Sequence, residues 1–250
     1  MKLYQYTTIE ALSLILKNRT IRFSRLDTVD DPDEYQFEKD GINPSQYVFV
    51  SCWSKVIDEC IPMWRMYANN GRGVRIGLDS NMFEMKYSGR FPYFFDVHYF
   101  FDKDFIMTPL MRNQEPHYPL YDIQYVSETK SALDRIFKET DGGVNLDFKE
   151  LAKYKSTDWQ FQREVRFVIN LLPKKRQTDR VYNFRTSIPE GIPIEERFID
   201  VPIKESVFML MEVMLGPEAV ESDASIVESL MYNYLGRKDC AISKYRVTKD

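Results

Sequence analysis

Alternation of apolar and polar side chains predicts strands over 2–7, 20–26, 46–54 and 73–79 in the first third of the chain. In the last of these, Val74, Ile76 and Leu78 share one face, which is therefore expected to point inward. Apolar residues at helical spacing predict a helix from Ile9 to Asn18, and a second, short helix begins near Pro62 and ends before Gly71.

The later pattern alternates less regularly. Residues 80–126 are predicted to be an irregular insertion around one strand near 95–100, and amphipathic helices are predicted over 127–140 and 146–156. A strongly apolar strand is predicted directly after Gln162, and a polar hairpin or loop is predicted over 173–196. A strand over 207–215, a helix over 223–235 closed by Gly236, and a strand over 241–247 complete the chain.

These elements do not repeat as regular strand–helix–strand units. The predicted fold class is therefore α+β, with a mixed, largely antiparallel sheet at the core and flanking helices. A length of 250 residues is sufficient for one large core, so we expect a single domain over 1–250.

Composition narrows the classes of function. A net charge of −4 provides no overall positive field for nucleic acid, and no stretch has the roughly 18 consecutive apolar residues of a membrane span. The N-terminal apolar run is too interrupted for a signal peptide, so we expect a cytoplasmic protein without a membrane partner. Its 3 Cys and 2 His lack the spacing of metal ligands, and no metal site is predicted.

The segment "DWQFQREVRFVINLL" carries the clearest candidate chemistry. Strand periodicity places Glu164 and Arg166 on one face, with Gln162 just ahead of them. A buried carboxylate needs either a cation or a polar cleft. One interpretation is therefore a structural ion pair between Glu164 and Arg166 or across strands, and the other is a reactive carboxylate.

Several segments together suggest a family. "LYQYTTIEALSLILKNRTIRFSRLDTVDDPDE", "FVSCWS", "MWRMYANNGRGVRIGLD" and "KSTDWQFQREVRFVI" resemble, in this order and spacing, a prokaryotic domain-of-unknown-function family. Some of its members are associated with abortive infection, the self-sacrificing defence of bacteria against phage. The resemblance covers about the first 80 residues and then 154–169, with "EVMLGP" as a weaker match.

That family in turn resembles the ADP-ribosyltransferase fold, in which a Glu opens a late strand. The resemblance implies NAD as substrate, Glu164 as catalytic acid and Gln162 as its upstream partner. It places Ser51 and Ser54 in a hydroxyl-bearing middle strand. It also places Gln5 or Tyr6, ahead of Thr7, in the first strand, where the fold commonly has His or Arg.

The chemistry of NAD gives further residues a role. Cleavage of the bond between nicotinamide and ribose develops positive charge on the sugar, which a carboxylate stabilises. Aromatic rings stack on nicotinamide or adenine, for which Tyr6, Trp53, Trp64 and Tyr67 are candidates, and Arg22, Arg65 or Arg75 is expected to hold the pyrophosphate. A duller interpretation remains for Trp64 and Tyr67, whose i, i+3 spacing on a helix also suits core packing.

Three classes of function stay open. The first is an NAD-dependent ADP-ribosyltransferase or NAD hydrolase acting as a toxin-like effector, with a macromolecular acceptor and a neutralising partner. The second is a non-catalytic module on the same fold that binds a nucleotide, nucleic acid or phage protein. A nuclease would have to use the acidic turn Asp31, Pro32 and Glu34, whose carboxylates otherwise cap the turn, face solvent or form a lip for substrate.

Overall fold

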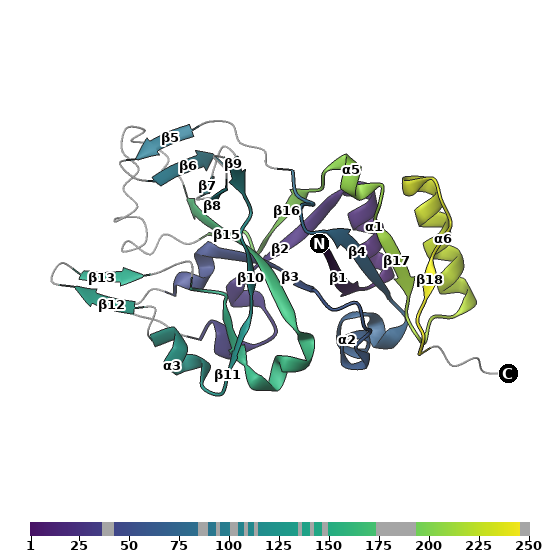
Figure 1. The fold of residues 1–250 in the computed structure, drawn as a ribbon, viewed down its shortest axis with the longest axis horizontal. Helices are drawn as coiled ribbons and strands as arrows, with labels where there is room; N and C mark the ends of the chain where they lie inside the picture. Colours follow the sequence, from purple (N-terminus) through teal and green to yellow (C-terminus); the bar gives the residue numbers. More distant parts are fainter. Residues whose placement is uncertain are drawn as a thin grey trace.

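The computed structural model describes residues 1–36, 43–84, 90–93, 96–100, 105–107, 110–112, 115–134, 137–140, 143–146, 150–173 and 194–245. Within these ranges the fold is α+β, and its largest element is a twelve-stranded sheet (Figure 1). Strand pairing in this sheet is antiparallel except where β17 meets β18. The predicted fold class, a largely antiparallel sheet with flanking helices, is confirmed.

The centre of the sheet is formed by strands that are far apart in the sequence. The order β18–β17–β4–β1–β3–β15 runs across it, β2 pairs with β3 and β16, and β10 pairs with β15. These strands are β1 (Lys2–Thr7), β2 (Thr20–Arg25), β3 (Val48–Ser54), β4 (Val74–Asp79), β10 (Leu120–Asp122), β15 (Glu164–Pro173), β16 (Phe198–Pro202), β17 (Glu212–Leu215) and β18 (Ala241–Ile242).

Shorter strands extend the sheet or form small pairs beside it. Strands β7 (Phe105–Met107), β6 (Asp96–Phe100) and β5 (Arg90–Tyr93) continue it beyond β15. The separate pairs join β11 (Gln124–Val126) to β14 (Tyr154–Ser156), β12 (Phe137–Thr140) to β13 (Gly143–Leu146), and β8 (Leu110–Arg112) to β9 (Glu115–His117). The region predicted to be irregular therefore contains short strands, including the expected one near 95–100.

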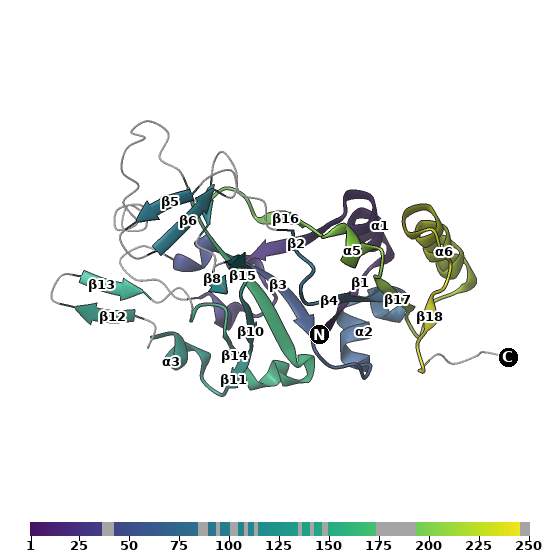
Figure 2. The same ribbon diagram turned by 45° about the horizontal axis from the view of Figure 1, so that its top comes forward.

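Helices cover the two faces of the sheet unequally. The helices are α1 (Ile9–Asn18), α2 (Ile61–Tyr67), α3 (Thr129–Asp134), α5 (Glu205–Phe208) and α6 (Glu221–Leu235). Leu12 and Leu16 of α1 and Val227 and Met231 of α6 pack into the main core. Figures 1 and 2 show α1 and α6 beside each other, with α2 apart from them.

Register distinguishes the two faces. We call the face that carries Leu3, Phe49, Val165 and Phe167, under α1 and α6, the helix face. Because Glu164 pairs with Ser54 and Arg166 pairs with Cys52, these side chains share the other face, which we call the cleft face. Tyr4 also pairs with Ser54 and lies on the cleft face.

Some predicted elements are wrong. The helix expected over 127–140 ends at Asp134, and β12 follows it; in place of the helix over 146–156 are a turn and β14. The strand expected over 207–215 is divided between the end of α5 and β17. Most of the loop over 173–196 lies outside the described residues. No helix among the described residues is both long and apolar enough to span a bilayer.

Candidate functional site

A cleft of about 230 Å³ lies over the cleft face of β1, β2, β3 and β15. Its rim comes from the loop after β2, from α2, from the 3₁₀ helix η5 (Thr157–Gln162) and from β14. Its lining includes Tyr4, Tyr6, Arg22, Asp30, Cys52, Met63, Tyr67, Lys155, Gln162, Glu164 and Arg166. Strands from the first 54 residues and the much later β15 thus contribute to one hollow.

Most of the predicted site residues meet there. Gln5, Tyr6, Arg22, Ser51, Trp53, Tyr67, Gln162 and Glu164 all contribute to the lining of this cleft. Ser54 lines a neighbouring cavity of about 540 Å³, which shares Tyr6, Met63 and Gln162 with the cleft. Thr7 and Trp64 line neither of the two.

The middle-strand residues point differently from what the resemblance implied. Register places Ser51 opposite Phe167 and Trp53 opposite Val165, so both side chains lie on the helix face. The Trp53 indole N–H donates to Ser51 Oγ at 2.9 Å, and each residue is 2% exposed. The side chains that this strand presents beside Glu164 are instead Cys52 and Ser54.

Trp64 has a packing role. It is fully buried, packs edge-on against Tyr6 with ring centroids 4.8 Å apart, and donates its indole N–H to Glu59 at 2.9 Å. Stacking of Trp64 on a ligand is therefore excluded without rearrangement of α2. The core-packing interpretation of Trp64 is the correct one.

The three candidate arginines differ in their partners. Arg22 is paired with Asp200 at 3.1 Å and lies over the Phe198 ring, and Arg65 is paired with Glu218 at 3.3 Å. Arg75 lines a different cavity and has no carboxylate within ion-pair distance among the described residues.

Gln5, a candidate residue of β1, donates its side-chain amide to the carbonyl of Cys52 at 2.9 Å.

Three other buried charges surround the candidate catalytic acid, Glu164. Arg166 donates from Nε to Glu164 Oε1, from Nη1 to Glu34 Oε2, and from Nη2 to Glu34 Oε1 at 2.9 Å and Glu164 Oε2 at 3.2 Å. Lys155 Nζ lies 3.1 Å from Glu164 Oε2 and 3.3 Å from Glu34 Oε1. The two cations and two carboxylates balance, and we call this set the charge network. The expected pair of Glu164 with Arg166 is confirmed as part of it.

Electrostatics keeps Glu164 and Lys155 ionised. Burial by itself raises the pKa of Glu164, but the charges of Arg166 and Lys155 outweigh it and lower this pKa from 4.5 to about 2. Burial likewise disfavours the charged form of Lys155, and Glu164 reverses this effect, so the pKa of Lys155 is raised. Glu164 is therefore a carboxylate at neutral pH.

The acidic turn contributes to this arrangement in a way that its sequence does not reveal. Glu34 is 1% exposed and belongs to the charge network, and Asp31 caps the turn by accepting from the Asp33 amide at 3.1 Å. Neither carboxylate forms a solvated lip. Among the residues that the structure describes, no cluster of His, Cys, Asp and Glu has the arrangement of a metal site.

Cys52 is an unsuitable nucleophile despite its position. Burial and the adjacent charge of Glu164 both raise the pKa of its thiol far above the ordinary value of 9.0. Because the thiolate is the reactive form, the protonated thiol is inert at neutral pH. It lies on the cleft face opposite Arg166.

Gln162 is held by a hydrogen bond to α2 at the cleft rim. Its side-chain amide donates to the Tyr67 hydroxyl at 2.7 Å. Burial, followed by the Asp30 carboxylate, raises the pKa of Tyr67, so the phenol stays protonated at neutral pH. Gln162 is thereby connected to α2.

We expect Tyr67→Phe to lower the free energy of unfolding by about 1–2 kcal/mol, because the buried Gln162 amide loses its acceptor. Urea unfolding followed by circular dichroism measures this change. Tyr232→Phe is the matched control, since Tyr232 is 59% exposed and its loss is expected to change stability little. Equal stability of the Tyr67 variant and the parent would contradict the described hydrogen bond between Gln162 and Tyr67.

Comparison with known proteins finds a family match for part of this chain. Searches of curated proteins and of solved structures give no match. The expected likeness to a domain-of-unknown-function family is confirmed for the segment from α2 to β15: residues 63–167 match the family described as "Protein of unknown function (DUF2971)".

Proposed function

We propose that the cleft binds NAD and that the chain transfers ADP-ribose from it to a macromolecule or to water. The observation that supports this most is the meeting of β1, β3 and β15. Glu164 at the start of β15, Gln162 just before it and Tyr6 from the first strand line one cleft, although more than 150 residues separate the two segments. Unrelated polar residues from segments so far apart in the sequence would not be expected to line the same cleft.

The proposed reaction breaks the bond between ribose C1′ and the nicotinamide nitrogen. The bonding electron pair leaves with nicotinamide and neutralises its pyridinium charge, while positive charge develops on the ribose. An acceptor oxygen or nitrogen then bonds to C1′, and its proton passes to solvent. Glu164, ionised at neutral pH, stabilises the developing cation, and the Gln162 amide orients the acceptor without adding negative charge.

The residues present fit the ligand in part. Tyr6 and Tyr67 offer aromatic surface in the cleft, and Arg22 lies at its edge. A carboxylate has about four acceptor positions. Arg166 and Lys155 occupy three of those of Glu164. About one position is therefore left for a ribose hydroxyl unless one of these donors moves away.

This occupancy favours a second candidate function, in which the cleft binds a nucleotide and leaves it intact. Glu164 would then serve the fold through the charge network, and the aromatic residues and Arg22 would provide recognition. The two candidates share the binding site and differ in the fate of the ligand.

Incubation of the purified protein with NAD labelled in the adenosine tests both, with nicotinamide release and label transfer to bacterial lysate as readouts. Under the first proposal the protein releases nicotinamide, and Glu164→Gln lowers the rate by about a hundredfold, the order expected when an electrostatic stabiliser is removed. Tight binding of intact NAD in calorimetry, without release, supports the second candidate. Neither binding nor release would overturn both.

Glu205→Gln is the matched control, because this exposed carboxylate pairs with Arg19 on the surface outside the cleft. Thermal unfolding shows whether the Glu164 variant is folded, and Gln162→Ala, which keeps the charge network, gives an independent variant. We extend the proposal to a toxin-like role in phage defence, with a neutralising partner in the cytoplasm. In that case the parent arrests growth on expression, and Glu205→Gln arrests it equally.

A further inference from the structure

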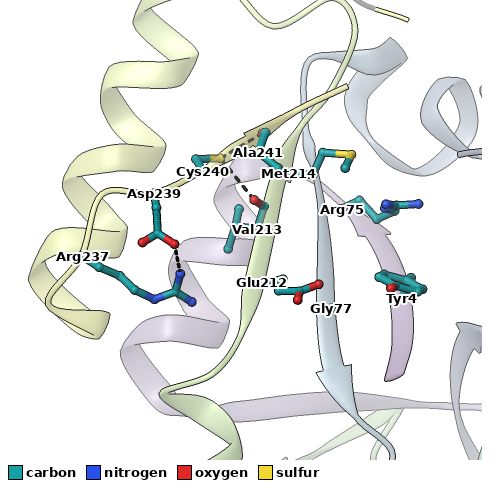
Figure 3. Close-up of a pocket in the computed structure, with 10 residues that line it drawn as sticks. All are labelled: Tyr4, Arg75, Gly77, Glu212, Val213, Met214, Arg237, Asp239, Cys240 and Ala241. Atoms are coloured by element: carbon teal, nitrogen blue, oxygen red, sulfur yellow. Dashed lines mark hydrogen bonds and ion pairs between the residues drawn. The ribbon is translucent and has the colours of Figure 1, made fainter. Parts of the chain in front are cut away.

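A second cavity, of about 360 Å³, lies on the same sheet face toward the β17 and β18 edge (Figure 3). It shares Tyr4 with the cleft, and its other lining residues include Arg75, Gly77, Glu212, Met214 and Arg237. Figure 3 shows Arg75 and Tyr4 close together on neighbouring strands, with Arg237 and Asp239 on the far side of β17. None of the residues assigned to NAD cleavage lines this cavity.

Arg75 is a buried cation that has no counterion among the described residues. It is 5% exposed, its guanidinium carbon lies 4.6 Å from the centre of the Tyr4 ring, and Nη1 donates to the Ile57 carbonyl at 2.7 Å. Its Nε has no acceptor among the described residues. Tyr6, which also interacts with Arg75, supplies no negative charge because burial raises the pKa of its hydroxyl.

The other charges around the cavity are already balanced. Arg237 is paired with Asp239 at 2.7 Å, and Glu212 is paired with Lys2. Within the part of the chain that the structure describes, Arg75 therefore leaves one positive charge uncompensated beside the cavity. Burial of an unpaired charge is costly, and an arginine edge suits a carboxylate or a phosphate oxygen.

The cavity also has room beside that charge. Gly77 lies on its lining, and a Cβ there would come within 3.2 Å of both Glu212 Oε2 and Tyr4 Cε1. Glycine thus keeps the space between these side chains open. The Tyr4 ring and Met214 supply apolar surface next to the guanidinium.

We propose that this cavity binds a small organic molecule through a singly charged oxyanion, a carboxylate or a phosphodiester, that pairs with Arg75. The apolar part of the ligand lies against Tyr4 and Met214. One negative charge matches the one uncompensated cation, whereas a doubly charged phosphate would leave an excess. This site goes beyond the proposed function, since its ligand need not be a nucleotide.

Titration of the full-length protein with benzoate, dimethyl phosphate, inorganic phosphate and benzamide at constant ionic strength tests the proposal. We expect saturable binding of benzoate or dimethyl phosphate, read from NMR shifts of Tyr4 and Met214, and at least tenfold weaker binding of neutral benzamide. The stronger of the two anions identifies the oxyanion. Equal binding of benzamide and benzoate, or no saturable binding of either anion, would overturn it.

Arg75→Met is expected to weaken anion binding at least tenfold, while the control Arg19→Met, at an exposed pair with Glu205, leaves it unchanged. Gly77→Ala keeps Arg75 and narrows the cavity, so it gives a second variant if Arg75→Met fails to fold. Unchanged binding in Gly77→Ala, or in a folded Arg75→Met protein, would show that the anion binds elsewhere. The probes lack a nucleotide, so the result is independent of NAD cleavage.

Discussion

Arg166→Met is expected to lower the free energy of unfolding by about 3–5 kcal/mol, the range for a buried charge deprived of its partner. Arg166 is fully buried and is bonded to both Glu34 and Glu164. Its removal leaves two buried carboxylates facing the single charge of Lys155. Urea unfolding at neutral pH, or the fraction of soluble protein if the variant does not fold, measures the loss.

Arg65→Met is the matched control for this substitution. Arg65 forms an exposed ion pair with Glu218, and such pairs are worth about 0–1 kcal/mol. A Glu34→Gln and Arg166→Met double variant should recover part of the stability, because it removes one of the two buried carboxylates and leaves Glu164 paired with Lys155. If Arg166→Met were as stable as Arg65→Met, the charge network would not support the fold.

Acidification is expected to remove roughly 3 kcal/mol of stability through Glu164 alone, at about 1.4 kcal/mol per pKa unit. Its pKa is about 2 in the folded protein, against an ordinary value of 4.5. A carboxylate whose pKa is lowered by folding stabilises the folded protein at pH values above its pKa in the unfolded chain. This stabilisation is lost as the pH falls toward its pKa in the folded protein. The loss should therefore occur between about pH 4.5 and 2.

Unfolding free energies measured at intervals across this range give the slope, and ¹³C NMR of the side-chain carboxyl carbons identifies the group. The Glu164 signal should keep the shift of an ionised carboxylate at pH 3.5. Asp79 and Asp223, whose pKa values are also lowered, add to the slope. Titration of Glu164 near pH 4.5 would contradict the ion pairs described.

The strands around the site were predictable from sequence because each has a clear apolar face. The predicted inward residues Val74, Ile76 and Leu78 are at most 1% exposed, and α6 ends at Gly236 in the left-handed conformation, as expected. Where one segment changes element within a few residues, as between α3 and β12, periodicity alone suggested one long helix. Pairing with β13 decides the structure there.

The sequence predicted which segments line the cleft, and it did not predict the ion pairs between them. Strand periodicity gave the face of Glu164 and Arg166, and the resemblance brought Tyr6 to the same cleft. Glu34, 132 positions from Arg166, was missed because periodicity assigns a face and not a distant partner. A signal was present: an arginine within an otherwise apolar strand requires a carboxylate, and the acidic turn was a source of carboxylates elsewhere in the chain.

The sheet order has a consequence for the boundaries of the family segment. Within residues 63–167, β4 lies between β1 and β17, and β15 lies beside β3, and all three of those neighbours fall outside the segment. A fragment cut at these limits would expose unpaired strand edges, which are templates for aggregation. The autonomous folding unit must therefore include the first strands and the return of the chain through β17, so truncation at the family limits should yield insoluble protein.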